Sequence, residues 1–214
     1  MKYSEIRNKI VEIGRFLLEK DLTVGSSGNI SVFIPDNREI VITPSMIPFR
    51  KMKPEDLLVV DLEGNVIEGE RNPSVESQMH IKIYENRKNV NAIIHAHPIY
   101  ASAFAVSQKA IPPILDELAV YTGGAVHVAK YALPGTEELA NNALDALKEK
   151  KAVLLANHGI LVCGKNLDDA LDVLIKVERT AKIYILAKII GEVKLLPESA
   201  IKTEIELYEV MNEL

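Results

Sequence analysis

The sequence predicts a single α/β domain built on a central, largely antiparallel sheet. Three observations favour this class. The chain has 214 residues, a length that fits one large domain. Apolar side chains recur at helical spacing in some segments and gather in short β-rich runs in others. The two kinds of segment alternate, and no linker, repeat or low-complexity stretch separates them, so we expect residues 1–214 to form one domain.

The first half of the chain predicts one helix followed by two β-hairpins. Over residues 3–20 apolar side chains recur every three or four positions, which is typical of an amphipathic helix. A turn-rich stretch, 25–29, comes next, and the turn Glu63-Gly64-Asn65 separates two later β-rich runs. The strands are expected at 30–34, 40–43, 57–62 and 66–68.

The second half alternates helices with short apolar strands. Helices are expected at 76–85, 136–149 and 167–190. Two central strands are expected, at 92–97, ended by Pro98, and at 152–158, ended by Gly159. The apolar run 183–190 contains Lys188 and is shorter than the roughly 20 residues of a membrane span, so we interpret it as a buried part of the last helix.

Composition and charge exclude several classes of partner. Hydrophobic residues make up 48% of the chain and aromatic residues 5%, which predicts an aliphatic core. With 25 Lys and Arg against 30 Asp and Glu, the net charge is −5 and no basic block favours nucleic acid. Cys163 is the single cysteine, and the start of the chain does not resemble a signal sequence. We expect a cytoplasmic protein without a membrane or nucleic-acid partner.

Three histidines form a candidate metal site. His95 and His97 lie two apart in an expected strand, so their side chains project to the same side. His158, at the end of the other central strand, is a candidate third ligand. Three imidazoles with an open position suit catalytic zinc, although iron, cobalt, nickel and copper also bind imidazole. The alternative is that these rings are core or cap histidines without a metal. His80, on the polar side of its helix, and His127 do not share this geometry and are expected to be surface or packing residues.

Other polar residues have both an ordinary and a functional interpretation. Glu76 lies in the first helical turn after Pro73-Ser74, where a carboxylate favours the helix N-terminus; because this helix leads into the histidine strand, Glu76 is also a candidate fourth ligand or proton acceptor. The stretches 25–29, Thr43-Pro44-Ser45 and Pro73-Ser74 are ordinary turns, but their hydroxyls and free N–H groups are the kind that bind phosphate. No nucleotide-binding spacing is present.

Taken in order, these segments resemble the class II aldolase/adducin family, and within it the L-fuculose-1-phosphate aldolase branch. The likeness covers nearly the whole chain. It rests on Gly28-Asn29-Ile30-Ser31, Thr43-Pro44-Ser45, Pro73-Ser74-Val75-Glu76, His95-Ala96-His97, Gly123-Gly124 and Asn157-His158-Gly159.

The resemblance implies a three-layer α/β/α fold and a homotetramer with a zinc site near the subunit boundary. His95, His97 and His158 match the zinc ligands of the family. Glu76 matches the carboxylate that binds zinc in the resting enzyme and acts as acid/base once substrate displaces it. The positions that match the phosphate-binding residues are Gly28, Asn29, Thr43, Ser45 and Ser74. Val75 departs from the family, where many relatives have a second serine, and this departure should loosen phosphate binding or shift its geometry.

The resemblance implies two candidates for the second acid/base. Aldolases of the family usually have a tyrosine ahead of the Gly-Gly pair, whereas Glu117 stands at the closest matching position, and Tyr121 is the alternative. Related dehydratases use a glutamate near this place, and Glu117 is otherwise an ordinary solvated helix charge. Tyr208 matches a tyrosine of the mobile C-terminal segment in related aldolases, or it packs the last helix.

The resemblance therefore implies a metal-dependent aldehyde-lyase. The expected reaction is the reversible cleavage of a small ketose 1-phosphate, such as fuculose 1-phosphate or a deoxypentulose 1-phosphate, to dihydroxyacetone phosphate and a short aldehyde such as lactaldehyde. A pentulose-phosphate 4-epimerase and a methylthioribulose-1-phosphate dehydratase are alternatives on the same metal site. A non-enzymatic adducin-like interaction module would have lost the metal ligands, which this chain keeps.

Overall fold

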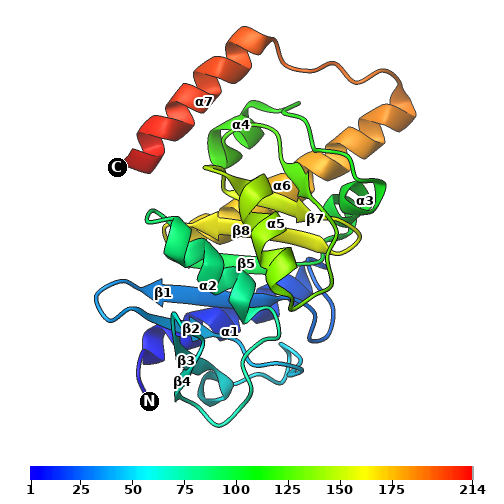
Figure 1. Cartoon of the computed structure of the whole chain (residues 1–214). Coiled ribbons are helices and arrows are strands. Elements are labelled where there is room, and N and C mark those ends of the chain that lie inside the picture. The colour runs from blue at the N-terminus through cyan, green and yellow to red at the C-terminus, as the bar shows by residue number, and fades with distance from the viewer. Residues whose placement is uncertain (214) are drawn as a thin grey trace.

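The computed structural model describes residues 1–213, and Leu214 lies outside this range. One eight-stranded sheet runs through the described chain in the order β4-β3-β2-β1-β5-β8-β7-β6 (Figure 1). The strands are β1 (Asn29–Ile34), β2 (Glu39–Ile42), β3 (Leu58–Asp61), β4 (Val66–Glu68), β5 (Ala92–Ala96), β6 (His127–Ala129), β7 (Ala152–Leu155) and β8 (Gly159–Gly164). All neighbours pair antiparallel except β6 and β7, which are parallel. The predicted, largely antiparallel sheet is confirmed.

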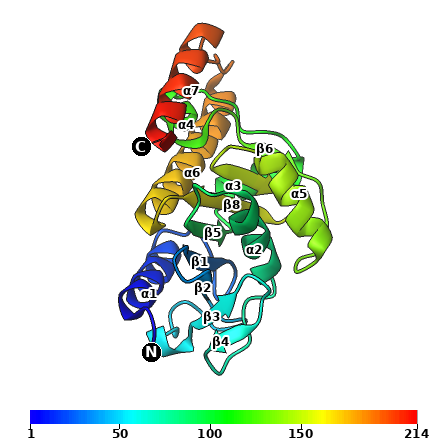
Figure 2. The same ribbon diagram turned by 60° about the vertical axis from the view of Figure 1, so that its left-hand side comes forward.

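Helices cover both faces of this sheet. They are α1 (Ser4–Glu19), α2 (Ser77–Asn86), α3 (Ile99–Ser107), α4 (Asp116–Thr122), α5 (Glu137–Leu147), α6 (Leu167–Ile190) and α7 (Glu198–Glu213). The side chains of β5 alternate: Ile94 packs in the core with residues of α1, α3 and α6, whereas Ile93 packs with α2 and α5. The three-layer α/β/α arrangement is therefore confirmed, and α7 packs on α4 beyond these layers (Figure 2).

Local sequence signals account for where the long helices begin. The side chain of Thr136 accepts a hydrogen bond from the backbone N–H of Leu139 at 3.2 Å, directly before α5. Asn166 accepts from the N–H of Asp169 at 2.9 Å, directly before α6. Both predicted hairpins in the first half are also present, as β1–β2 and β3–β4.

One predicted strand is wrong in its extent. The run 152–158 is not one strand, because β7 ends at Leu155 and the chain reverses before β8. Gly159 begins β8 instead of ending a strand, and β8, not β7, lies beside β5. Asn157 takes the left-handed conformation, with φ of 55°, and this allows the tight reversal.

The interpretation of the run 183–190 as buried is also wrong. Ile189 is 77% exposed and Ile190 is 88% exposed, because the end of α6 extends past the sheet (Figure 1). The helices α3, α4 and α7 were not predicted as such from the sequence pattern. Within residues 1–213, no helix is long and apolar enough to cross a membrane.

Candidate active site

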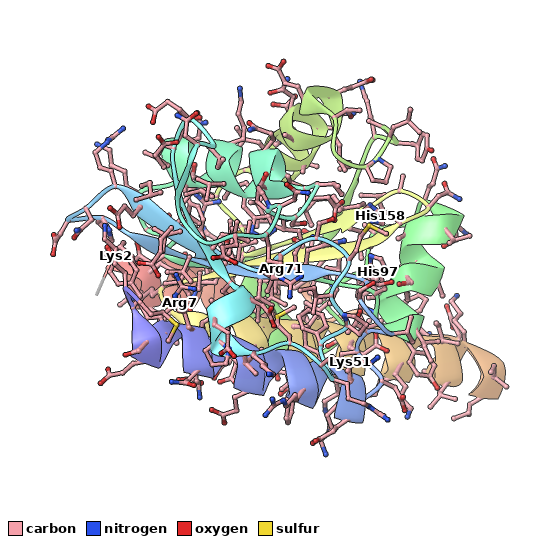
Figure 3. All side chains as sticks on the ribbon, turned by 90° about the horizontal axis from the view of Figure 1, so that it is seen from below. Lys2, Arg7, Lys51, Arg71, His97 and His158 are labelled. Carbon is pink, nitrogen blue, oxygen red and sulfur yellow. The ribbon has the colours of Figure 1, made fainter. Side chains whose placement is uncertain are left out.

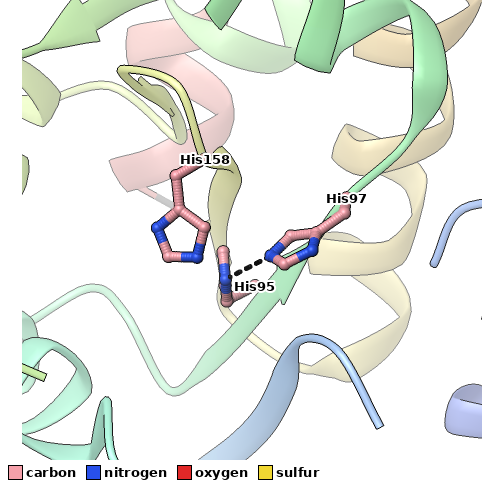
Figure 4. A group of neighbouring side chains, drawn as sticks. All are labelled: His95, His97 and His158. Carbon is pink, nitrogen blue, oxygen red and sulfur yellow. Dashed lines mark hydrogen bonds between the residues drawn. The ribbon is translucent and has the colours of Figure 1, made fainter. Parts of the chain in front are cut away.

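The histidine pair lies at the end of the central strand β5. His95 pairs with Asn29 of β1 on one side and with Leu161 of β8 on the other, and it is fully buried. His97 follows two residues later, and the Nε2 atoms of the two rings lie 3.0 Å apart. The two rings thus project to the same side, as alternation along a strand predicts (Figure 4).

His158 joins the pair from the turn between β7 and β8. Its ring centroid lies 4.7 Å from that of His95 and 5.0 Å from that of His97. The turn comes this close because Gly159 has no side chain: a Cβ there would lie 2.5 Å from the carbonyl oxygen of Ala96. One ligand atom from each histidine lies within 4.8 Å of the other two, so the three rings can share one metal ion (Figure 4).

The surroundings of these rings keep them in the form that binds metal. Nδ1 of His95 lies 2.8 Å from the carbonyl oxygen of Ile160. Because a carbonyl only accepts, Nδ1 carries the proton and Nε2 presents its lone pair to the cluster. Burial and the neighbouring imidazoles lower the pKa of His95 and that of His97 to about 3. Both rings are therefore neutral at neutral pH.

Glu76 places a carboxylate directly against the histidines. It precedes the first residue of α2 and is only 5% exposed. Its Oε2 lies 3.3 Å from Nε2 of His95, and its Oε1 lies 3.6 Å from Nε2 of His158. Nδ2 of Asn29 donates a hydrogen bond to Oε2 at 2.8 Å. Tertiary packing thus brings the end of β5, the start of α2 and the β7–β8 turn to one point.

These donors fit a divalent transition metal. Neutral imidazole nitrogens and a carboxylate oxygen are the ligands that such ions take in catalytic sites. Oε1 of Glu76 is buried and has no hydrogen-bond partner within residues 1–213. An unpaired buried acceptor costs on the order of 1–3 kcal/mol, and a bound cation would offset that cost.

The turns considered as phosphate-binding segments meet at the same end of the sheet. The backbone N–H of Thr43 donates to the carbonyl oxygen of Ile30 at 3.1 Å, and that of Ser74 donates to Thr43 at 3.2 Å. The N–H of Ser45 donates to the carbonyl of Asn72 at 2.9 Å. The two turns therefore run side by side next to the start of β1.

Gly28 brings the start of β1 against the histidine strand. It has a φ of +88°, and a Cβ at this position would lie 2.5 Å from the carbonyl oxygen of His95. Asn29 follows directly and contacts Glu76. Val75, where the sequence departs from the family, is 65% exposed between Ser74 and Glu76. Of the five candidate phosphate-binding residues, Gly28 approaches His95, and Asn29 and Ser74 contact Glu76.

The two candidates for the second acid/base lie on α4. Oε1 of Glu117 is 3.4 Å from Nε of Arg179, and the ring of Tyr121 lies 4.2 Å beneath Nζ of Lys176. The contacts described for both residues therefore run to α6, not to the histidine cluster.

Tyr208 packs the last helix against α4. It is 6% exposed, and its hydroxyl donates to the carbonyl oxygen of Glu149 at 2.6 Å. Its ring lies against Gly123, where a Cβ would be 2.9 Å from the ring edge. Burial raises the pKa of Tyr208 to about 12. Of the two interpretations of Tyr208, packing is the one that these contacts support.

The placement of His80 on the polar side of its helix is wrong. His80 is fully buried, and its Nδ1 lies 2.6 Å from Oγ of Ser31 on β1. Oγ of Ser31 also lies 2.7 Å from the hydroxyl of Tyr84. The spacing of Glu76, His80 and Tyr84, four residues apart, was the available signal, because it places all three on one stripe of α2.

A cavity lies away from the histidines. It measures about 640 Å³ and is lined by charged residues that include Arg7 and Arg71. These residues already pair with acids: Arg7 lies 2.9 Å from Glu68, and Arg71 lies 3.0 Å from Asp56. Arg7 lies well apart from His97 in Figure 3. Cavity size alone would therefore direct attention to the wrong part of the molecule.

Comparison with known proteins agrees with the geometry. Residues 8–185 match the family model described as the Class II Aldolase and Adducin N-terminal domain. The chain belongs to this family.

Similar proteins have related but distinct activities in their names. A 5-deoxy-D-ribulose 1-phosphate aldolase of Bacillus thuringiensis serovar kurstaki is 38% identical over 203 residues, which cover 95% of each chain. A 3-oxo-tetronate 4-phosphate decarboxylase of Haemophilus influenzae is 37% identical and covers 82% of this chain and 84% of its own. A solved structure of an L-fuculose 1-phosphate aldolase superposes with a TM-score of 0.93 at 44% identity, over 98% of both chains. The chain is a lyase of the class II aldolase type.

Proposed function

We propose that this enzyme is a zinc-dependent aldolase that reversibly cleaves a small ketose 1-phosphate to dihydroxyacetone phosphate and a short aldehyde such as lactaldehyde. The observation that carries the proposal is the convergence of His95, His97 and His158 beside the Glu76 carboxylate, with contacts of 3.0–3.6 Å. The names of the relatives support fuculose 1-phosphate and 5-deoxyribulose 1-phosphate as the first substrates to test.

Zinc is the metal that this ligand set suits best, because three histidines with an open position are typical of catalytic zinc. When bound, zinc supplies a Lewis acid that polarises the ketone and stabilises the negative charge that develops as the carbon–carbon bond breaks. His95, His97 and His158 would hold it, with Glu76 as the fourth ligand in the absence of substrate.

When the carbon–carbon bond breaks, one carbon keeps the electron pair. Glu76 would transfer a proton to this carbon, and would remove it in the reverse reaction. Asn29 orients this carboxylate, since its Nδ2 donates to Oε2 at 2.8 Å. Burial of Glu76 keeps bulk water away from the group. Glu117 or Tyr121 of α4 would transfer a proton to or from the oxygen of the departing aldehyde.

The phosphate of the substrate would lie against Gly28, Asn29, Thr43, Ser45 and Ser74. Oγ1 of Thr43 accepts from the N–H of Ile30 at 3.1 Å, and Oγ of Ser74 accepts from the N–H of Glu76 at 3.3 Å. A hydroxyl that accepts in this way still has its own hydrogen to donate to an anion. Both hydroxyls are therefore suited to phosphate.

We also propose a cytoplasmic homotetramer in which residues 1–214 form one domain and the active site lies near a subunit boundary. The exposed apolar side chains of Leu186, Ile189 and Ile190 at the end of α6 support burial against another subunit. Light scattering on the purified protein should give four times the mass of one chain, and the mass of a monomer would contradict the assembly.

The test of the reaction is a substrate panel with two inhibition controls. Purified enzyme is given fuculose 1-phosphate, 5-deoxyribulose 1-phosphate, ribulose 1-phosphate, ribulose 5-phosphate and methylthioribulose 1-phosphate. Dihydroxyacetone phosphate is measured with a coupled dehydrogenase. Chelator should abolish its release and added zinc should restore it, whereas borohydride with substrate should trap no covalent adduct. A trapped adduct with chelator-resistant cleavage would exclude the metal-aldolase mechanism.

The same panel separates the rival activities. An epimerase would interconvert pentulose 5-phosphates without net release of dihydroxyacetone phosphate, and a dehydratase would release water from methylthioribulose 1-phosphate. The decarboxylase among the relatives justifies adding 3-oxo-tetronate 4-phosphate, with carbon dioxide as the measured product. An interaction module without activity would cleave none of these and would bind no divalent metal.

A further inference from the structure

A second row of buried polar contacts lies beside the metal cluster, between α2 and β1. Glu76, His80 and Tyr84 are spaced four residues apart and are 5%, 0% and 4% exposed. They face Asn29 and Ser31, which alternate along β1 and therefore share a side of the sheet. The side chain of Asn29 donates a hydrogen bond to Glu76, and Oγ of Ser31 contacts both His80 and Tyr84. The stripe thus runs without interruption from the candidate acid/base to a buried tyrosine.

The hydrogen bonds of this stripe determine where the proton of His80 lies. Burial raises the pKa of Tyr84 well above its ordinary value, so its hydroxyl keeps its hydrogen and can donate it to Oγ of Ser31 at 2.7 Å. Ser31 then has its own hydrogen to donate to Nδ1 of His80 at 2.6 Å. Burial keeps the His80 ring neutral. A neutral ring that accepts at Nδ1 carries its proton at Nε2.

This Nε2–H of His80 has no partner in the part of the chain that the structure describes. One helical turn earlier, Oε1 of Glu76 is also buried and unpaired. Residues four apart on a helix are neighbours on its surface, which puts the Glu76 and His80 side chains on one stripe of α2. A spare donor and a spare acceptor, both buried and on one helix stripe, each carry a cost that a shared hydrogen bond would reduce, and the second lone pair of Oε1 stays available to a metal ion.

We propose that His80 is a positioning residue for Glu76: its Nε2–H provides, directly or through one bound water, the hydrogen bond that orients the Glu76 carboxylate beside the metal cluster. Asn29 already donates a hydrogen bond to Oε2 of Glu76. A second donor at Oε1 would hold the carboxylate in one orientation toward the substrate carbon. The catalytic consequence rests on the proposed function, whereas the hydrogen bond itself does not.

Two substitutions of similar size separate this role from simple packing. In His80→Asn the side-chain oxygen replaces Nδ1 as the partner of Ser31, but nothing replaces the Nε2 donor. In His80→Gln the side-chain amide reaches further and restores a donor near the Nε2 position. We expect H80N to lower kcat by about 10- to 100-fold with KM and zinc content unchanged, and H80Q to recover most of that loss. Equal losses in H80N and H80Q, or a loss explained by missing zinc, would overturn the proposal.

A second measurement does not depend on activity. In the metal-free protein, 15N NMR of the histidine rings should show His80 protonated at Nε2 and not at Nδ1. The Nε2–H resonance of His80 should shift in Glu76→Gln and stay unchanged in Glu85→Gln, a carboxylate on the exposed side of the same helix. The opposite tautomer, or no response to E76Q, would exclude the hydrogen bond. If wild-type enzyme cleaves no substrate of the panel while these NMR results hold, the proposed reaction fails and the hydrogen bond stands.

Discussion

The two ends of the candidate active site are built in different ways. The metal end, made of Glu76, His95, His97 and His158, is enclosed by strand pairing and helix packing, and its contacts close within one chain. The α4–α7 layer, which carries the candidate second acid/base, is peripheral. There the side chain of Glu117 is 38% exposed and contacts Arg179, which is 65% exposed. Strand pairing and helix packing can therefore bring buried polar groups together within one chain, whereas a surface helix leaves its polar groups available to solvent, substrate or another subunit.

Removing one metal ligand should have the largest effect on activity. We expect His97→Ala to lower kcat/KM by about 10³-fold or more, because the Lewis-acid contribution amounts to several kcal/mol. Substrate cleavage and zinc content should fall together. His127→Ala removes an exposed histidine on β6 and should leave both near wild type. Full activity and zinc content in H97A would contradict the role of this ligand.

Variants of α4 test whether the peripheral layer takes part in catalysis. Either Glu117→Gln or Tyr121→Phe should lower kcat by about 10²-fold, the usual range for loss of a general acid/base. The other should have a small effect. Arg179→Gln is the matched control, because it removes the ion pair and keeps the Glu117 carboxylate. Wild-type kcat in both E117Q and Y121F would place the second acid/base elsewhere.

Acid should destabilise the metal-free protein, because it protonates His95 of the metal end and the neighbouring buried His80. Burial lowers the pKa of His80 and that of His95 to about 3, below the unfolded value near 6.5. Between these values the unfolded chain binds more protons, so stability is full above pH 6.5 and falls as the pH drops below it. The expected loss is about 1 kcal/mol per pH unit for each ring. Urea unfolding of chelator-treated protein at pH 7.5 and 5.5 measures this loss in the free energy of unfolding. Equal stabilities at the two pH values would contradict the conclusion that His80 and His95 are buried as neutral rings.

Alanine substitutions at two glycines of positive φ allow the metal end and the α4–α7 layer to be compared by their effect on stability. Gly28→Ala should destabilise strongly, because the new Cβ meets the backbone oxygen of His95 at 2.5 Å, which cannot move without shifting β5. Gly123→Ala should cost only about 1–2 kcal/mol for its left-handed backbone, because the Cβ meets the ring edge of Tyr208 at 2.9 Å, which can shift. Thermal unfolding of both variants tests the order. A larger loss in G123A would reverse the comparison.

Much of the architecture follows from local pattern. The amphipathic helix at the start, the two hairpins and the capped helices α5 and α6 were predictable because period, turn residues and caps act within a few positions. The same-side projection of His95 and His97 needs only the alternation of a strand. The β7–β8 hairpin was missed because Gly159 is typical of a strand end, and its actual role, close approach to Ala96, depends on a distant strand.

Contacts between distant segments decided the remaining features. The burial of His80, expected on the polar side of its helix, depends on β1, which supplies Ser31 from 49 positions away along the chain. The exposure of Ile189 and Ile190 depends on where the sheet stops beneath α6. The number of imidazoles, their spacing and the family likeness were properties of the sequence. Their approach to Glu76, and the separation of Glu117 and Tyr121 onto another layer, arose only in the folded chain, because strand register and helix packing set distances that no local pattern contains.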